Sequence, residues 1–126
     1  MFLVLRTEFI TENELLQRTK TFALRVIKLV NALPNNIAGR KIGDQLIRSG
    51  TSVAANYRAA CRGRSKAEFI AKLGIVEEEA DESALWMELI IESELLKKNL
   101  VENLLQEAVE ITKIMAASKI SARNNN

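Results

Sequence analysis

Residues 42–69, IGDQLIRSGTSVAANYRAACRGRSKAEF, decide the fold that the sequence predicts. At about 100° per residue, a helix over the first three quarters of this stretch places its apolar side chains in one sector and its arginines in the opposite one. Gly63 is a plausible end for that helix. Ser65 and Glu68, three residues apart, form a capping box that starts the next helix. The stretch therefore predicts two amphipathic helices joined by a short turn.

The chain on either side continues the same pattern. Apolar residues recur at helical spacing, and capping and breaking residues divide the chain into four predicted helices, over about 11–34, 36–62, 65–97 and 99–121. Short connections favour an all-α fold, an antiparallel up-down-up-down four-helix bundle. The pattern leaves open whether the third helix is unbroken near Ser93. Gly50 lies in the apolar sector of its helix, where a glycine costs about 1 kcal/mol against alanine, so close helix packing is expected there.

Three segments follow from this division. Residues 11–121 form the bundle, and residues 1–10 form an N-terminal arm, extended or frayed, that could pack on a neighbouring subunit. Residues 122–126 contain no large apolar side chain and are predicted to be a disordered tail.

Composition indicates a single domain in the cytoplasm. The chain has 126 residues, of which 48% are apolar and 27% charged, a balance typical of globular proteins. Its one cysteine excludes an internal disulfide and fits a reducing compartment. No apolar run approaches the roughly 18 residues of a membrane span, and FLVL near the start is too short for a signal peptide.

The residue types exclude most catalytic sites. The chain contains no histidine, which removes Ser-His-Asp and Cys-His catalysis, histidine metal ligation and the Glu-x-x-His di-iron site of ferritin-like bundles. Cys61 lies on the apolar sector and is expected to be a small buried hydrophobe. The acidic residues from Glu77 to Glu82 are expected to be a solvated face. We therefore expect no enzyme activity, no cofactor and no metal.

Charge is unevenly distributed although the net charge is only +2. Residues 35–64 carry +5 and residues 65–96 carry −7. The positive side chains follow one side of the second helix and its end: Arg40, Lys41, Arg48, Arg58, Arg62 and Arg64, with Lys66 beside them. Arginines at this spacing can contact the phosphates of RNA or DNA without reading sequence. The equal alternative is that they pair with the acids of the third helix, within or between subunits.

The third helix carries a second apolar face. Ile75, Trp86 and Leu89 lie away from its main apolar stripe, which predicts a homo-oligomer interface on its outer side. The alternative is that Trp86 merely covers the end of the bundle core.

The stretch QLIRSGTSVAANYRAACRGRSKAEFIAKLGIVEEEADESALWMELI resembles the four-helix bundle proteins of the 23S rRNA-intervening-sequence family. The resemblance covers about residues 11–120, including the Glu-rich turn and the region of Trp86. Its most specific motifs contain Gln45, Leu46, Arg48, Ser49, Ser52 and Asn56, then Arg64, Ser65, Glu68 and Phe69.

The resemblance implies a bacterial protein that often assembles as a ring-like pentamer. Some members are encoded inside insertions of large-subunit ribosomal RNA genes, and a related branch serves reverse transcriptases of diversity-generating retroelements as an accessory subunit. That branch is strongly basic, so the net charge of +2 disfavours the reverse-transcriptase role here. The family has no established catalytic residues, and none are transferred.

Two hypotheses follow. The first is a non-enzymatic, oligomeric bundle that contacts the RNA or DNA backbone through the basic side of its second helix. The second is a protein–protein assembly module or accessory subunit without direct nucleic-acid binding.

Overall fold

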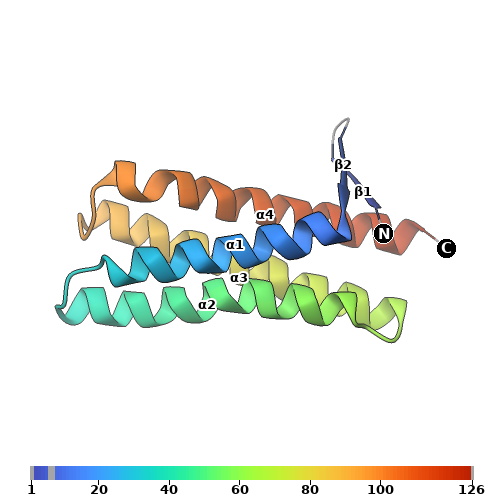
Figure 1. Cartoon of the computed structure of the whole chain (residues 1–126), viewed down its shortest axis with the longest axis horizontal. Helices are drawn as coiled ribbons and strands as arrows, with labels where there is room; N and C mark the ends of the chain where they lie inside the picture. Colours follow the sequence, from blue (N-terminus) through green and yellow to red (C-terminus); the bar gives the residue numbers. More distant parts are fainter. Residues whose placement is uncertain (1, 6–7, 126) are drawn as a thin grey trace.

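The computed structural model describes the backbone of residues 2–5 and 8–125 and the side chains of residues 10–125. Four long helices lie side by side and run alternately up and down, which confirms the four-helix bundle (Figure 1). They are α1 (Glu12–Asn31), α2 (Ile37–Cys61), α3 (Lys66–Glu92) and α4 (Lys98–Asn124). No helix in the described part of the chain is long and apolar enough to span a membrane.

The helices begin close to where the capping residues predict. The Thr11 hydroxyl accepts a hydrogen bond from the Glu14 backbone N–H, and the Glu14 carboxylate accepts one from the Thr11 N–H. Asn36 caps α2 by accepting from the Gly39 N–H at 2.7 Å. Ser65 caps α3, although the Glu68 carboxylate accepts from the N–H of Arg64 rather than from that of Ser65.

The junction between α3 and α4 differs from the prediction. The third helix ends at Glu92, not near Lys97, because Glu94 adopts a positive φ of 62° and turns the chain. The N–H of Leu95 then donates to the Ile90 carbonyl, which closes the turn. The fourth helix begins at Lys98 without a side-chain cap, so the predicted start at about residue 99 lies one residue late.

The C-terminal end is helical through Asn124, so most of the tail predicted to be disordered, residues 122–126, is an extension of α4. A lysine at the start of α3 explains the difference. The Lys66 ammonium donates to the backbone carbonyls of Arg123 and Asn125, at 3.4 and 2.6 Å. Such bonds satisfy carbonyls that a helix end leaves without partners.

The N-terminal segment forms a hairpin, where only an extended or frayed arm was predicted. Strand β1 (Phe2–Leu5) pairs antiparallel with β2 (Glu8–Thr11), with Phe2 opposite Thr11 and Leu5 opposite Glu8. The hairpin stands at the end of the bundle where both termini lie, and its strands contact α1 and α4 (Figure 1). Its predicted contact with a neighbouring subunit stays a prediction.

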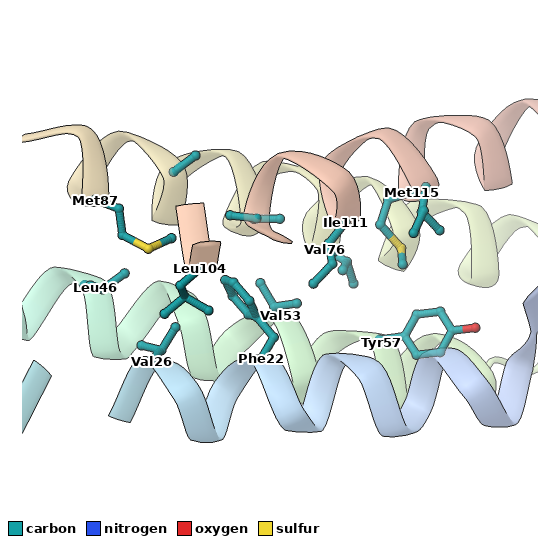
Figure 2. Close-up of a cluster of buried hydrophobic side chains, with 14 of the residues drawn as sticks. Phe22, Val26, Leu46, Val53, Tyr57, Val76, Met87, Leu104, Ile111 and Met115 are labelled. Atoms are coloured by element: carbon teal, nitrogen blue, oxygen red, sulfur yellow. The ribbon is translucent and has the colours of Figure 1, made fainter. Parts of the chain in front are cut away.

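All four helices contribute to one apolar core (Figure 2). Gly50 explains how closely α1 and α2 approach, because a Cβ atom there would lie 2.7 Å from a methyl carbon of Val26. The close packing predicted at Gly50 is confirmed. Helix α2 packs between α1 and α3, and α4 packs on α3 and α1, so α1 and α3 lie on a diagonal of the bundle.

Candidate nucleic-acid interface

The six predicted binding side chains are all exposed, but they do not share one environment. Five of them lie on α2 or its C-terminal cap, where 22 residues separate Arg40 from Arg62. At 1.5 Å per residue this row is about 33 Å long. The neighbouring helix differs from one side chain of this row to the next. Helix α3 borders one edge of the exposed side of α2, and α1 borders the other edge.

Arg48 is engaged by α3. Its guanidinium donates to the Glu79 carboxylate at 3.1 Å and also contacts the Glu82 carboxylate. The expected alternative, pairing with the acids of the third helix, is therefore correct for this arginine. Because its side chain is 47% exposed, solvent screens the pair.

Arg58 and Arg62 instead border an open groove between α1 and α2. The groove has a volume of about 740 Å³, and α1 contributes Glu12, Gln17 and Lys20 to its lining. Among the side chains that the structure describes, no carboxylate lies within 4 Å of the charged groups of Arg58, Arg62 or Lys20. Three cations thus surround the groove, with Glu12 as its one lining acid.

The position of these arginines also suits the helix itself. Arg58 lies in the last turn of α2 and Arg62 is its C-cap. Positive charge is favourable there, since the last carbonyls of a helix carry partial negative charge. This local effect explains why the arginines are tolerated, and it leaves their guanidinium groups in solvent.

The remaining predicted side chains lie outside the groove. Arg40 and Lys41 lie near the opposite end of α2, where Arg40 donates to the Asn35 side chain at 3.1 Å. Arg64 lies in the turn between α2 and α3, and its backbone N–H donates to the Glu68 carboxylate. Neither these three nor the groove cations form an ion pair with any described side chain.

The described side chains at the bottom of the groove include no activated nucleophile. Cys61 is half-buried there rather than fully buried, and burial together with the nearby Glu12 carboxylate raises the pKa of its thiol to about 11. Burial also raises the pKa of the neighbouring Tyr57 phenol. Both groups are protonated at neutral pH, so neither is an activated nucleophile. In the part of the chain that the structure describes, no three His, Cys, Asp or Glu side chains are grouped to hold a metal ion.

The residues predicted to form the oligomer interface on α3 also differ in their environment. Ile75 and Leu89 are 37% and 38% exposed. Trp86 is half-buried against the core, and its indole N–H donates to Glu82 at 3.3 Å. Leu85, 47% exposed, belongs to this outer side and was not among the predicted interface residues.

Sequence reasoning missed Lys20 and Gln17, which α1 contributes to the groove. The signal was present, because consecutive helices joined by a short turn must pack side by side. Lys20 lies on α1 at an angle away from the core stripe. Considering this angle together with the side of α2 that carries the arginines would have predicted the groove.

Comparisons with known proteins agree with this architecture. The family model described as 23S rRNA-intervening sequence protein matches residues 11–117. No curated protein matches the chain. A crystal structure of a protein of unknown function from the S23 ribosomal protein family of Bacteroides thetaiotaomicron is 32% identical in sequence. It aligns with a TM-score of 0.79 over 88% of this chain and 99% of that one.

Proposed function

Because the chain belongs to the 23S rRNA-intervening sequence protein family, we propose that it is a non-enzymatic bundle that binds the phosphate backbone of RNA or DNA. The binding site is the groove between α1 and α2. The observation that carries the proposal is the set of three cations, Lys20, Arg58 and Arg62, which border this groove without an ion pair to any described side chain.

The chemistry of the groove fits a phosphate backbone better than a small metabolite. Guanidinium groups bind phosphate oxygens through paired N–H donors. The groove is open and has no histidine or activated thiol to act on a bound ligand. No aromatic side chain lines it to stack a base, so binding is expected to depend on phosphate charge rather than on sequence. The family description names ribosomal RNA, which makes a structured RNA the first ligand to test.

A filter-binding titration tests the proposal, with an RNA stem-loop and a DNA duplex as probes. The double variant Arg58→Glu and Arg62→Glu should weaken binding about 100-fold, since it removes two charge-assisted contacts and adds repulsion. The matched control is Lys97→Glu with Lys98→Glu, which changes the net charge equally at the N-terminal end of α4. Equal losses in both variants, or no binding to either probe at low salt, would refute the proposal.

A second function is favoured by a different observation. Arg48 is held by α3 carboxylates, and leucine and isoleucine side chains are exposed on the outer side of α3. These features suit a self-associating assembly module, the alternative to direct nucleic-acid binding. Light scattering on the wild-type chain tests it, because a monomer at all concentrations would remove the assembly role.

A further inference from the structure

We infer that the outer face of α1 in one copy of the chain docks on the outer face of α3 in a second copy. The inference rests on the proposed self-association and names the two surfaces that perform it. The argument comes from exposed apolar side chains, from the charge around them and from the positions of the two helices in the bundle.

The outer face of α1 is apolar at its centre and basic around it. Leu24 is 58% exposed and Ile27 is 37% exposed. Lys20 and Lys28 lie one turn before and one turn after Leu24, so they project from the same side of the helix. From residue 15 to residue 31 the helix contains no Asp or Glu. We call Leu24, Ile27 and Lys28 the α1 face, together with Lys20 at the edge that this face shares with the groove.

The outer face of α3 has the opposite charge around a similar centre. Its exposed apolar side chains are Ile75, Leu85 and Leu89. From residue 74 to residue 96 the chain contains eight Asp or Glu residues and no Lys or Arg. We call these three apolar residues, with Glu78, Asp81 and Glu88 beside them, the α3 face.

The acids of the α3 face are not neutralised within their own chain. Glu77 pairs with Lys119, and Glu79 and Glu82 pair with Arg48. Among the described side chains, no cation lies within 4 Å of Glu78, Asp81 or Glu88. Like charges crowded on one helix repel one another, and a basic surface that covers them relieves this repulsion.

A second copy of the chain supplies the matching surface. Leucine and isoleucine would meet leucine and isoleucine at the centre, while lysines meet carboxylates around them. Since α1 and α3 lie on a diagonal of the bundle, with α1 in front of α3 in Figure 1, the two faces point away from each other. One chain therefore cannot join its own faces, and contacts between copies are head-to-tail, which gives a closed ring or an open chain.

Light scattering of single-site variants without nucleic acid tests this docking. Leu24→Glu places a carboxylate against the acidic α3 face, and Leu85→Lys places an ammonium against the basic α1 face. Each variant alone should fall from the wild-type mass to that of one chain. The matched control is Ile120→Glu on α4, which is 59% exposed and outside both faces, and it should keep the wild-type mass. Circular dichroism of each variant checks that it is folded.

Mixing the two variants distinguishes head-to-tail contact from other modes. The Leu24→Glu chain keeps an intact α3 face and the Leu85→Lys chain keeps an intact α1 face, so an equimolar mixture should regain at least twice the monomer mass. A wild-type monomer would overturn the inference. So would dissociation by Leu85→Lys alone with Leu24→Glu unaffected, which indicates contact between two α3 faces. Neither substituted leucine lines the groove, so failure here leaves the nucleic-acid proposal to its own binding assay.

Discussion

The two sides of α2 carry similar side chains that have different roles. On the side of α3, Arg48 is held by two carboxylates and the buried hydroxyls of Ser49 and Ser83 lie 2.8 Å apart. On the side of α1, Gly50 lets the helices approach closely, and Arg58 and Arg62 project over a groove whose other cation is Lys20. The neighbouring helix, rather than the arginine itself, thus decides whether a guanidinium group is used for packing or is available to a ligand.

The largest effect is expected on the α1 side, at Gly50. A side chain there overlaps Val26, which is fully buried and cannot move away. Gly50→Val should lower the free energy of unfolding by about 3 kcal/mol, as overpacking of a core does. Urea unfolding followed by circular dichroism measures it.

The control for Gly50 is another glycine in a helix. At Gly74 an added Cβ atom would be 3.9 Å from its nearest neighbour, the side chain of Lys119. Gly74→Ala should therefore stabilise the protein by up to about 1 kcal/mol through helix propensity. A neutral result for Gly50→Val would mean that α1 and α2 do not need their close contact.

A smaller effect is expected on the α3 side, at the paired serines. Ser49 and Ser83 are both fully buried, so Ser49→Ala leaves the Ser83 hydroxyl with one partner fewer and should cost about 1.5 kcal/mol. A double-mutant cycle with Ser83→Ala should give a coupling energy of about 1 kcal/mol. Ser118 donates to the Ile114 carbonyl within its own helix, α4, and it should show no coupling to Ser49.

The smallest effect on stability is expected from the arginines, and it tests directly whether the α3 side and the α1 side of α2 differ. Arg48→Ala should lower the free energy of unfolding by about 1 kcal/mol at low salt, and by less at high salt, because its ion pairs are partly exposed. Arg58→Ala removes no described ion pair and should stay within about 0.5 kcal/mol of the wild type. Equal and salt-independent losses would contradict the distinction between the two sides.

The sequence was sufficient for the bundle because its signals are local. Capping side chains at Thr11, Asn36 and Ser65, together with apolar residues at helical spacing, determine where the first three helices begin. The end of α3 was misplaced because the turn depends on a positive φ at Glu94, a conformation that glutamate seldom adopts. The helical tail was missed because Lys66, whose ammonium donates to the carbonyls of the tail, is about 58 residues away along the chain.

The site was predictable only in part for the same reason. Helical angles place Arg48, Arg58 and Arg62 on one exposed side of α2, yet they do not say which neighbour reaches each arginine. Glu79 and Glu82 pair with Arg48 because α3 lies beside that edge, whereas α1 brings Lys20 to the other edge. The division of the row depends on contacts between helices, which a single-helix analysis does not contain.

The most direct test of this division is the salt dependence of RNA binding. The logarithm of the binding constant should fall linearly with the logarithm of salt concentration, and each lost phosphate contact should reduce that slope by about 1. We expect Arg58→Ala and Arg62→Ala each to reduce the slope in this way, and Arg48→Ala to leave it unchanged. A slope reduced equally by Arg48→Ala, or unchanged in all three variants, would contradict the account.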